Sequence, residues 1–349
     1  MHPLNEQSFT YAPGGGYPFY LTAKRYWLSG SEGNDDDDGL TLLFLHATSF
    51  MKETWIPPLE ALFSLASTAG SPVKIREAWC LDCPNHGASA ALNTRALLQP
   101  EYYLSFSCER YAQAAHRFLS IGPEQGGVDF RTRNLVGVGQ SLGGCSITIL
   151  QGIQPVFPFQ SLVLIEPLIS PMGAHRLSSL RKILVKGAYE RRDVWPDRQQ
   201  ALAASRDRES RKRWDPRVLQ IYIEYGIVEH PGAQFKEGAQ FKEGAYHGVT
   251  LACTRDQEAT MYRDPNGATK PLENLASLAR TYPVHLILGE IADVLPKDVH
   301  AAIVEAAPYA SRTVIKGAGH QTIQEAPDQV GRAVYDALVM NARGVRSRL

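Results

Sequence analysis

The chain has 349 residues, of which 36 are lysine or arginine and 36 are aspartate or glutamate, so its formal net charge is zero. Such a balance argues against general nucleic-acid binding, and no run approaches the roughly 18 consecutive apolar residues of a membrane span. Five cysteines are few and odd in number, so no disulfide framework is expected.

Short apolar runs alternate with longer amphipathic segments along most of the chain. The predicted strands are residues 20–27, 40–45, 73–81, 135–138, 162–165, 284–288 and 313–315, and the predicted helices include 101–119 and 324–340. This alternation predicts an α/β fold, with a mostly parallel sheet flanked by helices on both faces. The aspartates at 35–38 lack the spacing of a calcium loop and predict a solvated hairpin tip, so no metal or other cofactor is expected.

Residues 139–143 read Gly-Gln-Ser-Leu-Gly, the G-x-S-x-G form of a nucleophile elbow. They lie between an apolar strand and a segment that can continue as a helix, which is the setting that the motif requires. The turn holds its serine in a strained backbone conformation, and the flanking glycines let strand and helix pass closely. Ser141 is therefore the candidate nucleophile.

An oxyanion hole needs two backbone N–H groups aimed at the developing charge. Leu142, directly after the candidate nucleophile, is expected to supply one of them. The loop after the 40–45 strand reads His46-Ala47-Thr48, and Thr48 is expected to supply the other.

The segment from Ser170 to Asn274 interrupts the alternation of strands and helices. Its composition predicts a helical cap or lid at 170–274, inserted into an α/β core formed by 1–169 and 275–349. Between 171 and 214, twelve lysines and arginines stand against five acidic residues. A solvated helical face is the plainer explanation of this excess, and the alternative is a basic lid that steers and holds a phosphate-bearing substrate.

A serine hydroxyl is a weak nucleophile and needs an adjacent base. The candidate base is His320, in a glycine-rich loop between the last predicted strand and the terminal helix.

The carboxylate that orients His320 has two main candidates. Glu166 directly follows a wholly apolar strand, where a charged side chain is unusual unless it has a function. It is therefore the favoured carboxylate for orienting His320. Asp293 follows the 284–288 strand and stays open as the alternative, with Glu290 a weaker third.

The chain ends in Ser347-Arg348-Leu349, a close variant of the Ser-Lys-Leu tripeptide that the peroxisomal import receptor binds. A basic, polar stretch precedes it. We therefore expect import into the peroxisomal matrix, with the import receptor as a partner. Unpaired cysteines suit such a reducing compartment.

Together with the 82–89 turn, which reads Asp-Cys-Pro-Asn-His-Gly-Ala-Ser, these motifs resemble the α/β-hydrolase superfamily. With the terminal tripeptide, the chain is more narrowly similar to the AK-toxin hydrolase family of fungal peroxisomal hydrolases in toxin and secondary-metabolite pathways. That family includes the acyl-CoA hydrolase of mycophenolic acid synthesis. Two positions depart from its pattern, Ala47 in place of glycine and Glu166 in place of aspartate.

The resemblance implies a serine hydrolase of the thioesterase or carboxylesterase type, acting on a small-molecule acyl-CoA or ester through an acyl-enzyme. Two alternatives stay open. One is an acyltransferase, in which an alcohol or amine replaces water. The other is a catalytically silent binding protein on the same fold. Epoxide hydrolysis and dehalogenation are disfavoured, because those reactions need a carboxylate where this chain has Ser141.

Overall fold

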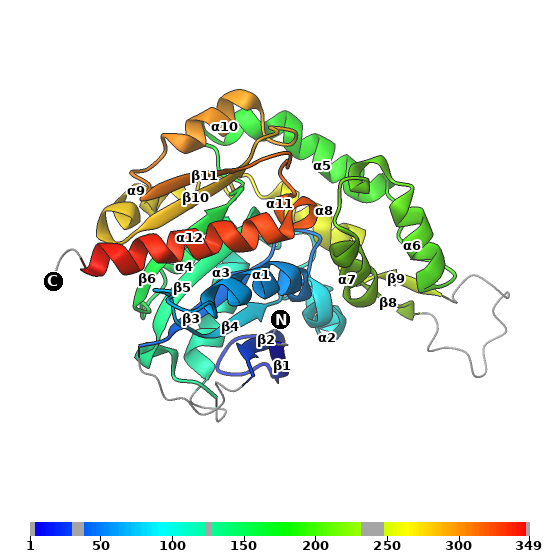
Figure 1. Ribbon diagram of the computed structural model, residues 1–349. Helices are drawn as coiled ribbons and strands as arrows, with labels where there is room; N and C mark the ends of the chain where they lie inside the picture. The colour runs from blue at the N-terminus through cyan, green and yellow to red at the C-terminus, as the bar shows by residue number, and fades with distance from the viewer. Residues whose placement is uncertain (1–3, 30–37, 123–126, 232–247, 347–349) are drawn as a thin grey trace, which may run out of the picture.

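The computed structural model describes residues 4–29, 38–122, 127–231 and 248–346. An eight-stranded sheet runs through the molecule in the order β1-β2-β4-β3-β5-β6-β10-β11 (Figure 1). Its strands are β1 Leu4–Tyr11, β2 Leu21–Leu28, β3 Leu40–Leu45, β4 Ile75–Leu81, β5 Asn134–Gln140, β6 Phe159–Ile165, β10 Val284–Gly289 and β11 Ser311–Ile315. β2 is antiparallel to β1 and β4, and the other neighbours are parallel. The predicted α/β architecture is confirmed.

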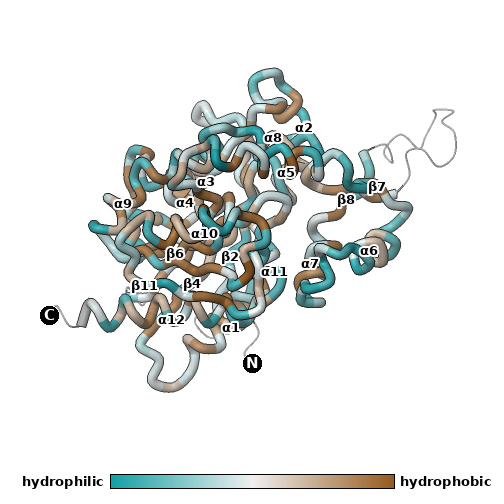
Figure 2. Tube along the Cα trace, turned by 90° about the horizontal axis from the view of Figure 1, so that it is seen from above, coloured by the Kyte–Doolittle hydropathy of each residue, from teal (hydrophilic) through white to brown (hydrophobic). Residues whose placement is uncertain are grey.

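Helices cover both faces of this sheet. One face packs against α1 (Ile56–Ala66) and α12 (Pro327–Arg346), and the other against α3 (Cys108–Ile121), α4 (Leu142–Leu150), α9 (Leu272–Thr281) and α10 (Lys297–Val304). α2 (Gly87–Leu97) follows β4. Figure 2 shows hydrophobic strands at the centre and hydrophilic helix surfaces outside. Burial on two faces explains why the central strands are continuous apolar runs.

In the α/β core, three elements differ most from the prediction. The helix expected at 101–119 begins only at Cys108, where the Ser107 side chain accepts a hydrogen bond from the Arg110 N–H and caps it. The terminal helix is divided, with α11 at Thr322–Glu325 and α12 starting at Pro327. The edge strand β1 was not predicted, because its sequence is mostly polar and four of its eight residues are exposed. The aspartates at 35–37 lie outside the described residues.

The 170–274 segment contains helices α5 (Ser178–Glu190), α6 (Arg198–Arg206), α7 (Pro216–Gly226) and α8 (Arg255–Arg263). It also forms a small antiparallel sheet in the order β7-β9-β8, from Val194–Trp195, Val249–Leu251 and Ile227–Glu229. The sequence predicted helices alone, since strands of two or three residues are too short to show a period. No helix in the described part of the chain is long and apolar enough to cross a bilayer.

A separate hydrophobic cluster joins this segment to the loop after β3. Trp214, which follows α6, and Tyr222 of α7 pack against each other and against Phe50, with the ring centres of Phe50 and Trp214 5.5 Å apart. Because Phe50 follows the predicted oxyanion loop directly, this contact fixes the inserted segment above that end of the sheet.

Candidate active site

The G-x-S-x-G turn forms a sharp bend between β5 and α4. Ser141 has φ 51° and ψ −111°, an unfavourable region for a residue with a side chain. Its N–H donates to the Ile165 carbonyl at 2.9 Å, which ties the bend to the neighbouring strand. A side chain at Gly143 would collide with the Leu45 carbonyl, so only glycine allows α4 to approach β3 this closely.

His320 lies between Ser141 and Glu166. Its Nε2 is 3.0 Å from Ser141 Oγ, and its Nδ1 is 2.9 Å from Glu166 Oε2. Since a carboxylate can only accept, Nδ1–H donates to Glu166 and Nε2 is left to accept the serine proton. The three side chains thus form one hydrogen-bonded chain, with spacings that allow a nucleophile, a base and an orienting carboxylate.

The Glu166 carboxylate is buried, and both of its oxygens accept hydrogen bonds. Its Oε1 accepts a hydrogen bond from the Gly289 N–H at 2.6 Å and another from His300 Nε2–H at 3.2 Å. Burial alone would raise its pKa, but the hydrogen bonds from His300, His320 and Gly289 outweigh it and lower the pKa to about 2. The same contact raises the pKa of His300. Glu166 is therefore ionised at neutral pH.

This lowered pKa predicts a pH dependence of stability. A carboxyl group whose pKa is lower in the folded than in the unfolded state stabilises the fold above its ordinary pKa of 4.5, and loses that effect as the pH falls toward about 2. Unfolding in urea, measured from about pH 5 down to about pH 3, should therefore lose stability more steeply in the unaltered protein than in Glu166→Gln. Equal slopes would contradict the burial and bonding described here.

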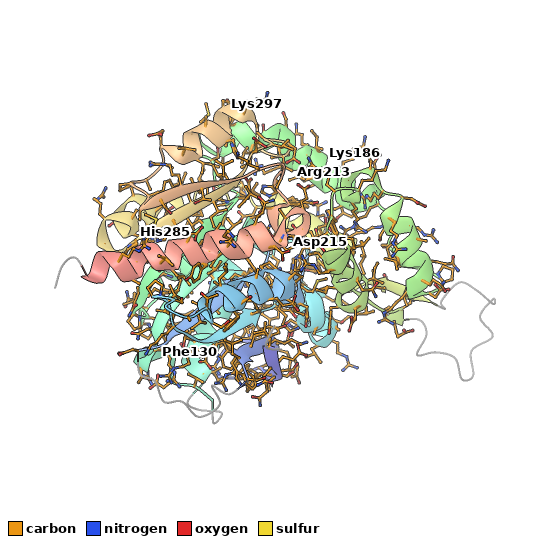
Figure 3. The ribbon with its side chains drawn as sticks, viewed as in Figure 1. Phe130, Lys186, Arg213, Asp215, His285 and Lys297 are labelled. Carbon is orange, nitrogen blue, oxygen red and sulfur yellow. The ribbon has the colours of Figure 1, made fainter. Side chains whose placement is uncertain are left out.

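Asp293 contacts the backbone of the same histidine rather than its ring. Its Oδ1 accepts from the His320 N–H at 2.9 Å, and its Oδ2 pairs with Arg213 Nη2 at 2.5 Å. Arg213, labelled in Figure 3, also pairs with Glu325, which accepts the N–H of Gly319. Asp293 and Glu325 therefore hold the histidine loop by its main chain, while Glu166 holds the imidazole.

Sequence reasoning missed three of these contributors, His300, Arg213 and Glu325. His300 is 134 residues from Glu166 and Arg213 is 80 residues from Asp293, so no local spacing signals either contact. Glu325 had a weak signal, because it lies five residues after His320 at the start of the terminal helical region. Arg213 belongs to the basic stretch already noted.

The two predicted oxyanion donors both lie near Ser141, Thr48 in the lining of the same cavity and Leu142 as the next residue in the chain. Thr48 lines the same cavity as Ser141 and His320, and within the residues that the structure describes its N–H makes no hydrogen bond. Leu142 is the first residue of α4, where an N–H has no partner inside the helix. Both N–H groups are thus available to a ligand atom at Ser141.

His46 stabilises the Thr48 loop through two hydrogen bonds. Its Nδ1–H donates to the Ala47 carbonyl at 2.8 Å, and its Nε2 accepts the Cys83 N–H at 3.0 Å. Burial lowers the pKa of His46, so a neutral ring is favoured and both hydrogen bonds are kept. The loop therefore holds its shape although it carries Ala47 where glycine was expected.

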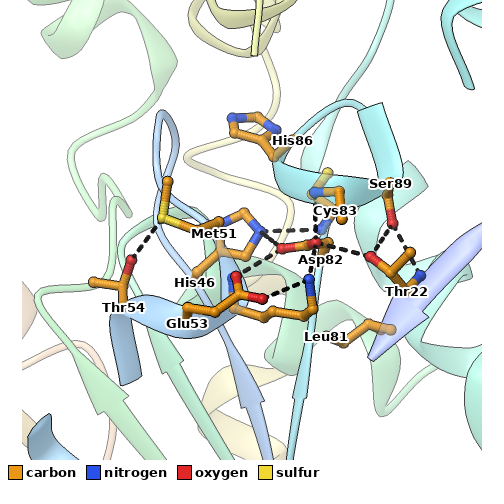
Figure 4. A network of polar contacts seen from close by, with 12 residues as sticks. Thr22, His46, Met51, Glu53, Thr54, Leu81, Asp82, Cys83, His86 and Ser89 are labelled. Atoms are coloured by element: carbon orange, nitrogen blue, oxygen red, sulfur yellow. Dashed lines mark hydrogen bonds and ion pairs between the residues drawn. The ribbon is translucent and has the colours of Figure 1, made fainter. Parts of the chain in front are cut away.

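A buried charged network lies beside this loop (Figure 4). Asp82 Oδ2 accepts from Lys52 Nζ at 2.7 Å and from the Thr22 hydroxyl at 2.8 Å, and its Oδ1 accepts the Lys52 N–H. Glu53 pairs with the same ammonium at 2.9 Å. Burial opposes ionisation of Asp82, but the charge and hydrogen bonds of Lys52 outweigh it and hold the pKa of Asp82 below the usual value. The network joins the loop after β3 to the end of β4.

Replacing Asp82 with asparagine should destabilise the protein by about 3 kcal/mol, because the buried Lys52 ammonium loses one of its two counter-charges. The free energy of unfolding in urea is the measurement. Glu229→Gln is the matched control, since Glu229 pairs with Arg198 on the surface and water screens that pair. A loss no larger than that of the control would contradict a structural role for the network.

The Ser141 hydroxyl opens into a cavity of about 310 Å³ between the sheet and the 170–274 segment. The core contributes Thr48, Ser141 and His320, and the inserted segment contributes aliphatic residues of α5 together with arginines. A smaller apolar recess of about 40 Å³ adjoins it beside Leu142, lined by Leu168, Leu180 and Leu184. The site therefore offers an apolar side and a basic side to one ligand.

Comparisons with known proteins agree with the α/β fold described above. The model of the Alpha/beta hydrolase family matches residues 42–333. Over 206 residues, 57% of the chain, the sequence is 32% identical to the "Type I acyl-CoA thioesterase mpaH" of Penicillium brevicompactum, 42% of which is covered. Over 134 residues, 38% of the chain, it is 34% identical to the "Abhydrolase domain-containing protein AFT2-1" of Alternaria alternata, 45% of which is covered. The chain thus spans less than half the length of either relative.

Among solved structures, the peroxisomal alpha-beta-hydrolase Lpx1 of Saccharomyces cerevisiae superposes with a TM-score of 0.68 at 19% identity, over 97% of this chain and 90% of that one. The thioesterase domain from the curacin biosynthetic pathway gives a TM-score of 0.60 at 16% identity, over 95% of this chain and 99% of that one. At such identities the likeness concerns the fold.

Proposed function

The chain belongs to the alpha/beta hydrolase family, and on that premise we propose that it is a serine hydrolase that cleaves the thioester of an acyl-CoA through an acyl-enzyme. The observation that carries the proposal is the hydrogen-bonded chain from Ser141 Oγ through His320 to Glu166, at the floor of a cavity. The thioesterase title of the Penicillium relative supports the substrate class. The departure at Glu166 is no obstacle, since glutamate can orient a histidine as aspartate does.

In the proposed reaction, His320 Nε2 takes the proton of Ser141 as its Oγ attacks the carbonyl carbon. The N–H groups of Leu142 and Thr48 stabilise the oxyanion. The C–S bond then breaks, the CoA sulfur leaves with the proton from His320, and the acyl group stays on Ser141. A water molecule, deprotonated by His320, attacks this ester and releases the acid. The Glu166 carboxylate stabilises the imidazolium in both halves of the cycle.

We further propose that residues 170–274 act as the cap of this site on a core of 1–169 and 275–349, and that the apolar recess holds the acyl chain. Support comes from the cavity, whose walls include residues of both parts. α9 runs across the proposed boundary, so the cap ends within a helix rather than in a linker.

A panel of acyl-CoA thioesters and simple esters tests the reaction. We expect hydrolysis that releases equal amounts of CoA and free acid, with preference among acyl groups set by the recess. Addition of alcohols or amines should leave the yield of free acid unchanged. Formation of an ester or amide in place of the acid would instead identify an acyltransferase. Absence of turnover, together with no labelling of Ser141 by a fluorophosphonate, would identify a silent binding protein.

We also propose that the protein acts in the peroxisomal matrix. The description of the yeast neighbour as peroxisomal supports this, as does the tripeptide at 347–349, which lies outside the described residues. A fluorescent protein fused ahead of the chain should enter peroxisomes. Deletion of 347–349 should leave it outside, and import that survives the deletion would contradict the proposed signal.

A further inference from the structure

A second cavity, of about 300 Å³, adjoins the active-site cavity within the 170–274 segment. Four arginines line it, namely Arg191, Arg192, Arg208 and Arg211. Three of them, all but Arg192, also line the cavity that contains Ser141. The volume is at the lower end of the range of small-molecule sites, about 300–1,000 Å³. The arginines therefore form a shared wall between the catalytic serine and a second, basic compartment.

The positive charge of this wall is mostly uncompensated by the protein. Arg191 pairs with the buried carboxylate of Glu258. Arg192 donates to a backbone carbonyl, and Arg211 donates to the Ser205 hydroxyl and lies over the rings of Trp214 and Tyr222. The guanidinium of Arg208 makes no hydrogen bond or ion pair within the described residues, and only its backbone is bonded, to Ser205 and Arg211. Four guanidinium groups thus share one carboxylate.

Two further donors in the same wall lack an acceptor. Among the residues that the structure describes, Arg191 Nε and the indole Nε1 of Trp195 are buried and have no hydrogen-bond partner. Trp195 also lines the second cavity. A buried donor without an acceptor costs about 1–3 kcal/mol. Partial burial, together with the nearby charges of Arg211 and Arg191, lowers the pKa of Arg208. An anionic ligand in the cavity would satisfy the donors and neutralise the charge.

We propose that this arginine cavity binds the phosphate groups of the nucleotide end of a CoA substrate while its thioester lies at Ser141. The inference rests on the proposed function, which requires a substrate with its reacting bond at one end and a phosphorylated nucleotide at the other. Guanidinium groups bind phosphate oxygens through paired hydrogen bonds and stay protonated throughout the physiological range. Because three arginines line both cavities, the second compartment lies directly beside the one that contains Ser141. Binding energy from this remote end then positions the reacting bond.

Arg208→Gln is the main test, because Arg208 has no described partner whose loss would disturb the fold. The matched control is Arg206→Gln, which removes the same charge from the exposed end of α6 and lies in neither cavity. For each protein, kcat/KM is measured on the best acyl-CoA and on the acyl-pantetheine with the same acyl group, which lacks the nucleotide. The value on acyl-CoA divided by the value on acyl-pantetheine should fall at least tenfold in Arg208→Gln. In Arg206→Gln the same ratio should stay within about twofold of that of the unaltered protein.

An unchanged ratio in Arg208→Gln would overturn the inference, as would an equal fall in Arg206→Gln. In the first case the arginine does not recognise the nucleotide, and in the second case only the overall charge matters. High salt should narrow the difference between the unaltered protein and Arg208→Gln, since ionic strength screens the contact to phosphate.

A binding experiment separates this inference from the proposed reaction. In a Ser141→Ala background, calorimetry with CoA, adenosine 3′,5′-bisphosphate and inorganic phosphate should show binding of the first two, weakened at least tenfold by Arg208→Gln. If that pattern holds while the unaltered protein hydrolyses no acyl-CoA, the arginine cavity does bind the nucleotide, and the proposed hydrolysis is wrong. If CoA and the bisphosphate fail to bind, or bind no better than inorganic phosphate, the nucleotide assignment is wrong.

Discussion

Replacing Ser141 with alanine is expected to lower kcat for acyl-CoA hydrolysis by on the order of 10⁴-fold or more, without unfolding the protein. The variant loses the proposed nucleophile, while the proposed oxyanion donors, the cavity and the fold stay in place. Residual turnover should then come only from water attack within the bound complex. The unfolding midpoint should not fall, because alanine is no larger and, among the described residues, the Ser141 hydroxyl has a hydrogen bond to lose with His320 alone.

Ser146→Ala is the matched control for this experiment. Ser146 lies in the helix that Ser141 precedes and is buried, but its single hydroxyl proton is directed to the carbonyls of Cys108 and Leu142, and it does not line the cavity that contains Ser141. It should cost about 1 kcal/mol of stability and leave kcat within a few-fold. Ser141→Ala protein that keeps a tenth of the normal rate would rule out the acyl-enzyme route.

Replacing Glu166 with glutamine is expected to lower kcat on the order of 10⁴-fold. Glutamine has nearly the same shape, but it cannot stabilise the imidazolium that forms when His320 takes the serine proton. An amide N–H facing Nδ1 would also favour the wrong tautomer of the ring. The comparison is Asp293→Asn, which keeps an oxygen acceptor for the His320 N–H and weakens only the ion pair with Arg213. It should cost about tenfold or less.

The two variants discriminate between the carboxylates that the sequence left open. If Asp293→Asn lowers kcat as much as Glu166→Gln does, the bond from Asp293 to the His320 main chain is as important for turnover as the bond from Glu166 to the imidazole ring. Full activity in Glu166→Gln would exclude Glu166 as the orienting carboxylate.

Much of the fold follows from local sequence. Continuous apolar runs predict strands buried on both faces, and the alternation of such runs with helices predicts the parallel sheet. The prediction failed where packing on a neighbour decides the structure. β1 is polar and forms by pairing with β2 at the sheet edge, and the strands of the small sheet are two or three residues long.

The sequence by itself determined the choice of Ser141 as candidate nucleophile, since the elbow needs small residues two positions away on either side, and of His320 as candidate base, from its glycine-rich loop. The structure places the two side chains 3.0 Å apart. It could not decide between Glu166 and Asp293. Both follow parallel strands that are neighbours, β6 and β10, so both side chains reach the same edge of the sheet. Which carboxylate meets the imidazole depends on how the His320 loop lies across that edge.

Only the tertiary structure decided these contacts. It directs the ring of His320 to Glu166 and its main chain to Asp293, and it brings His300 to the far side of the Glu166 carboxylate. It also gathers the arginines of the 170–274 segment into one wall beside Ser141. The physical reason is that hydrogen bonds and charge interactions act over a few ångströms in space, whereas sequence patterns report only neighbours along a strand, a turn or a helix.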